Sequence, residues 1–429
     1  MRIAMLVIGS TGDVRPFVLL GQELKRRGHE ITIATFASFE GMVREAGLGF
    51  FSLAGDVMEV MANIMKPGTK GVSYLMQVEK SLKDIAPVLL RDLMQSAQGA
   101  DAMCCTFFGS MYYSVAEKYH IPCVQVQYCP VDPNGETPIS SAPGLGWGRW
   151  WNHLSYRLGY LLIGLLEKKY LTGWRRDNGI SLRRLHPHPD YALGENTIPV
   201  IYAISPVVMP RPRAWGANIH MSGFWWDDTP VNYTPPRALK DFLAAGERPV
   251  YIGFGSMVSG DMERTFGTVV DAVRVSGLRA VISLGWNSDR LRMTSDSDIF
   301  FAEYVPHDWL FPQVRAVVHH GGAGTTAAGL RAGKPTLVIP FGGDQPFWGS
   351  RVYAMGCGPR PLRREKLTVR RLSQALKELT GRDSYRVAAE EAAALLRRER
   401  GVQRAADLME REIAAWKGGK EEGDHAYNH

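Results

Sequence analysis

The chain has 429 residues, enough for two domains of ordinary size, and its 45% hydrophobic and 22% charged content is typical of a globular protein. No apolar stretch is long enough to span a bilayer, and the apolar run at residues 1–8 ends too early for a signal peptide. The five cysteines form no Cys-x-x-Cys pair, and their odd number and apolar settings indicate buried, reduced thiols in a cytoplasmic protein.

The formal net charge is +7 at pH 7, a sign that suits a nucleotide ligand or an anionic membrane surface. Much of the excess lies between residues 360 and 404, where basic side chains on solvated helix faces are the simpler explanation. The sequence contains no nucleic-acid-binding motif, so we expect no nucleic-acid partner.

The first part of the chain alternates between predicted strands and helices. A strand over residues 2–8 leads through a turn at residues 9–13 into an amphipathic helix over residues 14–27, and a second strand follows at residues 30–34. Further strands are predicted at residues 102–105, 123–127 and 200–203. This alternation predicts a parallel, doubly wound sheet, whose ligands bind beyond the carboxyl ends of the strands.

Asp13 lies in the first of these turns, where a ligand would bind. An aspartate before a helix is also a favoured N-cap, and Pro16 fits the first turn of the helix that follows. From these residues alone, a capping role and a catalytic role for Asp13 are both open.

Two segments, residues 52–98 and 130–195, interrupt the alternation and are rich in Met, Trp, Tyr and Pro. Within the second, a tryptophan-rich stretch over residues 147–158 continues into an apolar run over residues 158–166 and a Lys-Lys pair. Such a segment can line a wide apolar pocket, lie as an amphipathic helix on a membrane, or pack as an ordinary core helix. The sequence leaves all three open.

Beyond a proline-containing segment of mixed charge, the alternation resumes. A strand over residues 249–254 ends in a turn of small residues, including Gly255 and Ser256, that can approach a phosphate closely. A strand over residues 279–284 runs into Trp286, which is either a core aromatic or a wall of a nucleotide site.

The most informative stretch covers residues 316–326. An apolar run at residues 316–318 predicts a buried strand, His319 and His320 follow at its carboxyl end, and glycines allow a tight turn into a helix. Free backbone N–H groups and the positive end of a helix dipole meet there, which suits a diphosphate. The stretch contains neither Gly-Lys-Ser/Thr nor a spaced Gly-x-Gly-x-x-Gly, which argues against a P-loop NTPase and a nicotinamide dinucleotide site. A histidine here can donate a hydrogen bond to a phosphate and stabilise the charge of a departing nucleotide.

A second strand, predicted at residues 336–339, leads to Asp344 and Gln345. A carboxylate beside an amide can accept hydrogen bonds from vicinal hydroxyl groups and donate hydrogen bonds to them, as sugar recognition requires. The pair therefore predicts a sugar-binding position.

Three segments carry a family resemblance: residues 304–314 (YVPHDWLFPQV), 319–326 (HHGGAGTT) and 340–345 (PFGGDQ). Together they resemble the donor signature of the family 1 glycosyltransferases, and the first segment is similar to the sterol glucosyltransferase branch. The resemblance covers nearly the whole chain. It implies the type-B glycosyltransferase fold, an α/β architecture of two Rossmann-like parallel-sheet domains facing across a cleft, with the nucleotide sugar on the carboxyl-terminal domain and the acceptor on the amino-terminal one.

The resemblance also bears on Asp13. Many family members carry a catalytic histidine at this turn and an aspartate further along that orients it, whereas the sterol and glycopeptide branches carry Gly-Asp-Val, as residues 12–14 do here. The position of the orienting aspartate matches Thr106, and a carboxylate base has no tautomer to fix. The resemblance therefore implies that Asp13 is the general base.

The remaining site residues are also implied by the resemblance. Many plant relatives have tryptophan where Tyr304 stands and glutamine at His307, so the backbone of Val305 is the better candidate for contact with the base. The implied donor-binding residues are Gly12, Gly255, Ser256, Trp286, Val305, His307, His320, Gly322, Ala323, Gly324, Thr325, Asp344 and Gln345. In the family, insertions of the amino-terminal domain build the acceptor pocket, and the implied lining residues are Phe107, Trp147, Trp150 and Trp151. Neither a cofactor nor a metal ion is expected.

The domain organisation follows from the same alternation and resemblance. The predicted parts are an acceptor domain over residues 1–226, a linker over 227–247, a nucleotide-sugar domain over 248–402, a helix over 403–417 that crosses back to the first domain, and a disordered tail over 418–429.

The implied activity is inverting transfer of a sugar, glucose from UDP-glucose, to a hydroxyl of a lipophilic acceptor such as a sterol or triterpenoid. The alternatives are a bacterial natural-product glycosyltransferase, which would act on a polyketide, glycopeptide, carotenoid or phenolic with a UDP- or dTDP-sugar, and a non-catalytic binder of a sugar nucleotide or lipid. The expected location is cytoplasmic, with peripheral membrane contact left open.

Overall fold

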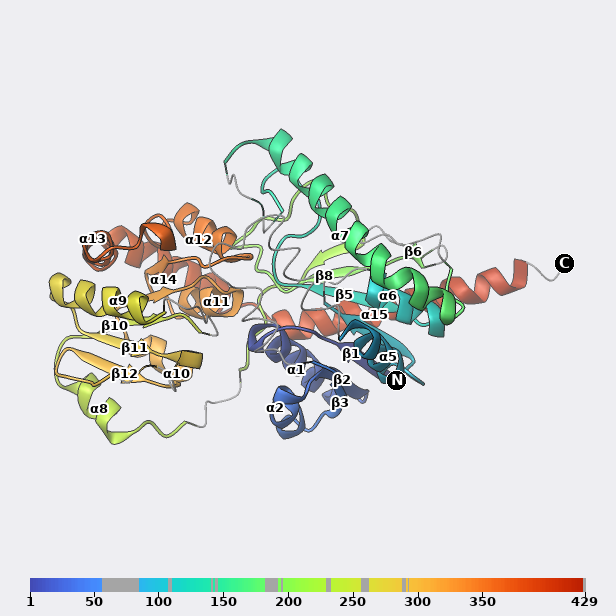
Figure 1. The fold of residues 1–429 in the computed structure, drawn as a ribbon, viewed down its shortest axis with the longest axis horizontal. Helices are drawn as coiled ribbons and strands as arrows, with labels where there is room; N and C mark the ends of the chain where they lie inside the picture. Colours follow the sequence, from blue (N-terminus) through green and yellow to red (C-terminus); the bar gives the residue numbers. More distant parts are fainter. Residues whose placement is uncertain are drawn as a thin grey trace.

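A computed structural model of the chain describes residues 1–55, 85–106, 110–139, 142, 146–181, 192–193, 196–228, 233–255, 262–287, 291 and 293–426. It shows two α/β domains next to each other, each built on a parallel sheet (Figure 1). The fold class predicted from the alternation of strands and helices is confirmed.

The N-terminal domain contains a seven-stranded sheet in the order β3-β2-β1-β4-β5-β8-β9, and all of its pairs are parallel. The strands are β1 (Arg2–Leu6), β2 (Glu30–Phe36), β3 (Gly49–Leu53), β4 (Ala102–Cys105), β5 (Cys123–Gln127), β8 (Val200–Tyr202) and β9 (Ile219–Met221). The described helices are α1 (Thr11–Arg26), η1 (Ala37–Phe39), α2 (Glu40–Glu45), α5 (Ala86–Ser96), α6 (Ser110–Tyr119) and α7 (Arg149–Asp177). A short antiparallel pair, β6 (Ala192–Leu193) and β7 (Asn196–Thr197), lies outside this sheet. Because β1 and β4 are covered on both faces, their sequences are apolar runs, and β5 is fully buried although it carries two glutamines.

The C-terminal domain contains a five-stranded parallel sheet in the order β12-β11-β10-β13-β14. The strands are β10 (Val250–Gly253), β11 (Ala280–Ser283), β12 (Ile299–Ala302), β13 (Ala316–His319) and β14 (Thr336–Val338). The helices are α8 (Arg237–Ala244), α9 (Met262–Ser276), η3 (Gly285–Asn287), α10 (His307–Leu310), η4 (Phe311–Gln313), α11 (Ala323–Arg331), α12 (Gln345–Ala354), η5 (Arg364–Lys366), α13 (Val369–Gly381) and α14 (Asp383–Leu396). The central strands β10 and β13 are neighbours, so the loops that follow them meet at one edge of the sheet.

The last helix, α15 (Gly401–Ala426), returns to the N-terminal domain and packs along α1 (Figure 1). Arg27, at the end of α1, joins the two helices: its Nη1 donates to Asp407 at 2.6 Å and to Glu410 at 2.7 Å, both on α15. The helix continues through Ala426, whereas the sequence predicts a disordered tail from residue 418. Once a helix is anchored by packing, each added residue gains a hydrogen bond without a new nucleation cost, so a polar extension can follow the packed part.

One hydrophobic core is shared by the two domains. It combines Tyr202 and Trp215 of the N-terminal domain, whose rings stack at 4.4 Å, with Leu330 and Trp348 of the C-terminal domain. Beside it, the Glu399 carboxylate accepts hydrogen bonds from Ser205 Oγ at 2.5 Å and from the Phe224 backbone N–H at 3.1 Å. Because large apolar contacts between domains restrict their relative motion, this core fixes how the two halves of the site are placed.

Candidate active site

The strand, the glycine turn and the helix predicted for residues 316–326 all form. β13 ends at His319, Gly321 has a φ of +97°, and Gly322 is the N-cap of α11. A Cβ at Gly321 would lie 2.6 Å from the side chain of Val338, so both the backbone conformation and the space at this turn require glycine. No side chain caps α11, which leaves the N–H groups of its first turn available to a ligand.

The imidazole of His320 lies over this turn. A Cβ at Gly322 would be 2.6 Å from its Nε2, and a Cβ at Gly255 would be 3.1 Å from its Cε1, so the ring is held between the loops after β10 and β13. Burial lowers the pKa of His320 to about 4, against an opposing hydrogen bond to the backbone of Gly253. The ring is therefore neutral at pH 7, and its Nδ1 is buried.

His319 has a different role, which sequence reasoning missed. Its side chain is fully buried, and its Nδ1 accepts a hydrogen bond from the Gly321 N–H at 2.9 Å. Burial holds its pKa well below the usual range, so the ring stays neutral with Nδ1 as an acceptor. His319 stabilises the turn from beneath, while His320 is the partly exposed member of the pair.

Asp13 lies at the start of α1, beyond the carboxyl end of β1. The helix begins at Thr11, three residues before the predicted start, and its N-cap is Ser10. The Asp13 carboxylate turns back to accept hydrogen bonds from the Ser10 N–H at 2.7 Å and Ser10 Oγ at 3.0 Å. The N-cap alternative is corrected: Asp13 occupies the third helical position, where a carboxylate also complements the helix dipole.

The surroundings of Asp13 favour a proton acceptor. Burial raises its pKa above the ordinary value, although the two hydrogen bonds from Ser10 oppose the shift. Its backbone carbonyl accepts a hydrogen bond from Tyr128 Oη at 3.0 Å, which joins the end of β5 to the first turn of α1. Thr106, the position matched to the family's orienting aspartate, is buried at the end of β4. Ser10 could have been found from its three-residue spacing to Asp13, but Tyr128 could not.

Asp344 and Gln345 follow β14 at the start of α12. Asp344 is the N-cap residue, and its Oδ2 accepts a hydrogen bond from Trp348 Nε1 at 2.7 Å. Gln345 Oε1 accepts from the backbone N–H groups of Phe341 at 2.6 Å and Gly342 at 3.1 Å, so this amide also shapes its own loop. The proposed contacts of both residues with a sugar remain predictions.

Electrostatic coupling shows that the two domains bring their site residues together. Burial raises the pKa of Asp344 to about 6, and the charge of Asp13 adds to this rise. Burial lowers the pKa of His307 to about 4, and the positive charge of Arg15 and, when it is protonated, that of His320 lower it further. The turn that carries Asp13 and Arg15 in one domain is thus close to Asp344 and His307 in the other.

His307 belongs to the segment assigned to the nucleotide base. Its ring stacks on Phe311 with centroids 4.4 Å apart, and its Nε2 is 3.3 Å from Tyr251 Oη. Val305 is buried, whereas Tyr304 is 68% exposed at the same edge of the sheet. The exposed ring of Tyr304 is available for stacking, but the base-binding assignment of Val305 and His307 remains a prediction.

Several assigned residues cannot be placed in the site. Ser256 and Phe107 lie outside the described residues, and Trp286 is described only as part of η3, without its side chain. Trp147 and Trp150 are 67% and 76% exposed, and Trp151 lies 5.1 Å from Trp147 between ring centroids. Among the described residues, no three His, Cys, Asp or Glu side chains are grouped as metal ligands would be.

Comparisons with known proteins agree with this arrangement. Residues 3–135 match the Glycosyltransferase family 28 N-terminal domain, and residues 272–401 match the Erythromycin biosynthesis protein CIII-like C-terminal domain. The structure of CalG4, the calicheamicin glycosyltransferase, has a TM-score of 0.68 at 18% identity and covers 96% of this chain and 98% of that one. Glycosyltransferase VinC in complex with dTDP has a TM-score of 0.68 at 18% identity over 97% of this chain and 100% of that one. The protein therefore has the type-B glycosyltransferase fold.

Sequence relatives define the family more closely. Two sterol 3-beta-glucosyltransferases of Arabidopsis thaliana are 35% and 33% identical over 94% and 96% of this chain, covering 64% and 68% of their own lengths. A sterol 3-beta-glucosyltransferase of Pichia angusta is 33% identical over 96% of this chain and 33% of its own length. The chain belongs to the sterol 3-beta-glucosyltransferase family. It spans about two thirds of the plant relatives and about one third of the fungal one.

Proposed function

We propose that the protein is an inverting glycosyltransferase that moves glucose from UDP-glucose to a hydroxyl group of a sterol or another lipophilic acceptor. One observation carries the proposal: Asp13 lies in the first turn of α1 in one domain, Asp344 is the N-cap of α12 in the other, and the charge on Asp13 contributes to the raised pKa of Asp344. A base on one domain and a sugar-binding group on the other are the arrangement that direct transfer between two substrates needs.

In this proposal Asp13 is the general base. It takes the proton of the acceptor hydroxyl as that oxygen attacks the anomeric carbon, and the bond from this carbon to the diphosphate oxygen breaks on the opposite face. Burial raises the pKa of Asp13, which makes the carboxylate a stronger base than an exposed one. The Ser10 hydrogen bonds and the Tyr128 contact hold the carboxylate and its backbone in place.

The leaving diphosphate would be stabilised by the loop after β13. The uncapped N-terminus of α11 offers backbone N–H groups from Gly322 to Thr325, and His320 offers its ring nitrogens. These groups would take the role that a divalent cation has in other nucleotide-sugar enzymes, so we expect activity in the presence of a chelator. Asp344 would accept hydrogen bonds from hydroxyl groups of the transferred sugar.

The sterol acceptor is proposed because the relatives at 33–35% identity are sterol 3-beta-glucosyltransferases. A natural-product acceptor with a dTDP-sugar is the second candidate, and the likeness in fold to VinC in complex with dTDP is the observation that favours it. We propose a cytoplasmic location, in which the five cysteines stay reduced, and a peripheral contact with membranes.

A donor and acceptor screen tests the proposal. The purified chain is incubated with UDP-glucose or dTDP-glucose and with a sterol, a macrolide or a phenol, and products are identified by mass spectrometry. We expect a sterol glucoside from UDP-glucose, with a β linkage by NMR if the anomeric centre inverts. Product only from dTDP-glucose and a macrolide or phenol would favour the second candidate, and an α linkage would contradict inversion.

A further inference from the structure

The first half of the long helix α7 presents several leucines outward and binds the protein partly through polar side chains. Its buried face carries polar groups that bind the loop over residues 131–139: Asn152 Nδ2 donates to the Gly135 carbonyl at 3.0 Å, and Ser155 Oγ accepts from the Ile139 N–H at 2.9 Å. Tyr160 Oη donates to the Val131 carbonyl on the same side. These hydrogen bonds act together with the packing of Tyr156 and Tyr160 against Ile139, and Leu171 is buried further along the helix.

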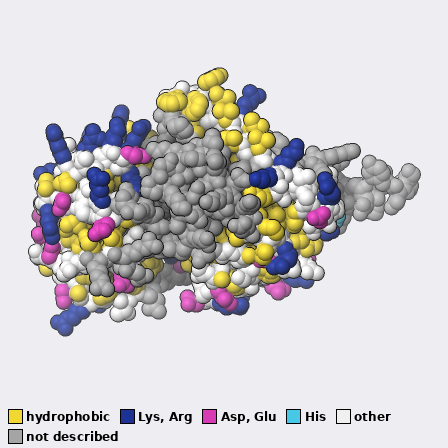
Figure 2. Space-filling model, in the orientation of Figure 1, with side chains coloured by type: hydrophobic (Ala, Val, Ile, Leu, Met, Phe, Trp, Pro, Cys, Tyr) yellow, Lys and Arg dark blue, Asp and Glu magenta, His cyan; other side chains and the backbone are white. Residues whose placement is uncertain are grey.

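The opposite face of α7 is apolar and faces outward. Leu158, Leu161 and Leu165 are 46%, 60% and 59% exposed, and Trp150, about two turns before Leu158, is 76% exposed. Figure 2 shows these hydrophobic side chains as a row over α7 at the upper edge of the molecule. A single exposed leucine is ordinary, but a row with helical spacing is a contiguous patch, and such patches mark contacts with a partner.

Basic side chains accompany this patch. Arg157 and Lys168 are exposed on α7 itself, within the same turns as the leucines. Figure 2 also shows Lys and Arg side chains gathered over the corner formed by α12 and α13, on the same upper edge of the molecule. Between residues 360 and 382 the sequence holds eight Lys and Arg against two Glu. The edge therefore combines an apolar row with a positive surface.

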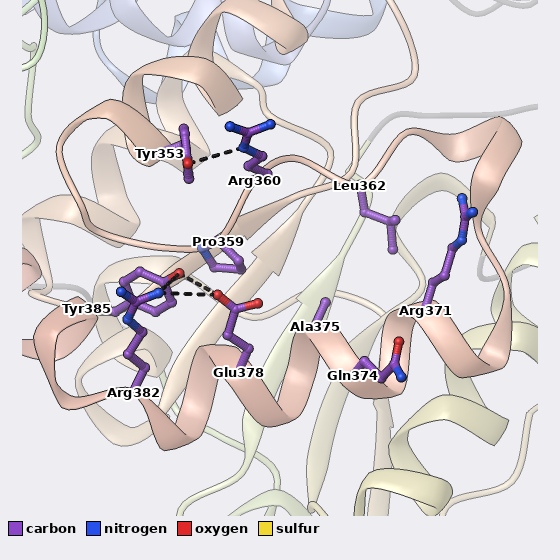
Figure 3. Close-up of a pocket in the computed structure, with 10 residues that line it drawn as sticks. All are labelled: Tyr353, Pro359, Arg360, Leu362, Arg371, Gln374, Ala375, Glu378, Arg382 and Tyr385. Carbon is purple, nitrogen blue, oxygen red and sulfur yellow. Dashed lines mark hydrogen bonds and ion pairs between the residues drawn. The ribbon is translucent and has the colours of Figure 1, made fainter.

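A groove of about 430 Å³ lies in that basic corner, between the end of α12 and α13 (Figure 3). Glu378 Oε1 accepts a hydrogen bond from Tyr385 Oη at 2.6 Å and lies 3.6 Å from Arg382 Nη1. The negative charge of Glu378 is thus balanced by Arg382. Arg360, whose Nε donates to Tyr353 Oη at 3.1 Å, and Arg371 reach away from Glu378 at the rim of the groove (Figure 3). These two arginines are placed to meet an anionic group from outside.

We propose that α7 and the arginine groove form one membrane-docking edge, whose partner is a bilayer that contains anionic lipids. The leucines and Trp150 of α7 enter the boundary between head groups and acyl chains, and the arginines near α13 bind lipid phosphates. No helix in the part of the chain that the structure describes is long and apolar enough to cross a bilayer, so the contact is peripheral. A bilayer is the partner that offers an apolar interior and negative charge along one plane.

Vesicle flotation with the full chain tests the proposal, without donor or acceptor, so that its result is independent of transferase activity. We expect binding to phosphatidylcholine vesicles that contain phosphatidylglycerol, weaker binding to phosphatidylcholine alone, and loss of binding at high salt. Leu161→Glu combined with Leu165→Glu should lower the affinity about tenfold or more, because apolar burial is lost. Val275→Glu is the matched control: Val275 is 57% exposed, on α9, and its substitution should leave binding unchanged.

A second variant tests the basic half of the edge separately. Arg360→Glu combined with Arg371→Glu should weaken binding to the anionic vesicles by about fivefold or more for each basic side chain lost, with little change on phosphatidylcholine alone. Circular dichroism checks that each variant is folded. The proposal is overturned if the leucine variant binds like Val275→Glu, or if wild-type protein does not bind anionic vesicles. It is also overturned if light scattering shows a dimer that the leucine variant converts to a monomer, since α7 would then be a subunit interface.

Discussion

Two strand-turn-helix units of the same design have opposite electrostatic character. β1 leads into α1 and β13 leads into α11, and the third helical residue is Asp13 in the first unit and Thr325 in the second. The carboxylate of Asp13 folds back on Ser10 at the start of its own helix. α11 begins at Ala323, and its N-cap, Gly322, provides no side-chain hydrogen bond.

The difference explains why only one of these turns suits a diphosphate. A carboxylate in the first turn of α1 already occupies the positive end of the helix dipole and would repel a phosphate. At α11 the dipole and the first N–H groups remain available, and the neutral His320 adds a hydrogen-bonding ring without a competing charge. In the proposed mechanism, one side chain at an equivalent position thus separates the site of the base from the site of the anion.

The largest expected effect comes from removing the charge of Asp13. Asp13→Asn keeps the size of the side chain and can still accept the hydrogen bonds from Ser10, so the helix start should survive. If Asp13 is the general base, the transfer rate should fall by about 10²- to 10⁴-fold. Transfer rate and melting temperature are measured on the same preparation. A variant that melts several degrees lower but transfers sugar at a near-normal rate would show that Asp13 only stabilises the helix.

His320→Ala, in the turn into α11, should have the next largest effect on turnover. Loss of a hydrogen bond to the charge that develops on the leaving diphosphate typically costs roughly 2.7–4 kcal/mol, or about 10²- to 10³-fold in turnover. Turnover and UDP affinity are measured by product formation and calorimetry. His153→Ala, at an exposed histidine on α7, is the matched control and should leave both unchanged. Normal turnover in His320→Ala would exclude this role.

Much of this comparison could be predicted from the sequence, because it depends on local patterns. Alternating apolar strands and helices predicted both sheets, and the glycines after His320 predicted the turn into α11. The sequence predicted the start of α1 three residues too late because Gly12 is a poor helix former. The hydrogen bonds between Ser10 and Asp13 compensate for this glycine, and they depend on side chains rather than on helix propensity.

Other features depend on tertiary placement, which the sequence did not provide. The coupling of Asp13 with Asp344 and the bond from Tyr128 Oη to the Asp13 carbonyl join parts of the chain that are far apart in sequence. The apolar pattern of α7 predicted a helix but not which face is outward. Polar side chains in its first half are buried against the loop over residues 131–139.

Thr325→Asp sharpens the comparison by copying the Asp13 position into α11. The new carboxylate should stabilise or leave unchanged the helix start, because it complements the dipole. It should lower UDP affinity by about ten- to hundredfold, because it competes for the N–H groups that would bind phosphate and repels its charge. Calorimetry and thermal melting measure the two effects, and Thr325→Asn is the uncharged control. Equal losses of affinity in both variants would point to a steric cause.

Proton uptake on nucleotide binding is a smaller effect with a defined sign. The pKa of His320 is about 4 without ligand, so the ring is neutral at pH 7. A bound diphosphate favours the protonated ring and raises this pKa, so binding should take up protons, and affinity should fall as pH rises above 4, by at most about tenfold per pH unit. Calorimetry in buffers of different ionisation enthalpy measures the uptake. His320→Ala should remove the part of the uptake that exceeds the titration of UDP itself.

The smallest effect concerns stability and the buried carboxylate of Asp344. The pKa of Asp344 is raised by burial, and further by Asp13, to about 6 from an ordinary value of 3.8. A raised pKa means that the folded protein binds this proton more tightly than the unfolded chain, so stability is lost as pH rises from about 4 through 6 and remains reduced above that.

Asp344→Asn keeps an acceptor for Trp348 Nε1 and removes the charge. Its melting temperature should therefore exceed that of the wild type by a few degrees at pH 8, and the gain should disappear near pH 4. In the Asp13→Asn background the gain should be smaller, because part of the cause is already gone. An equal gain at every pH would mean that burial of charge at Asp344 is not what limits stability there.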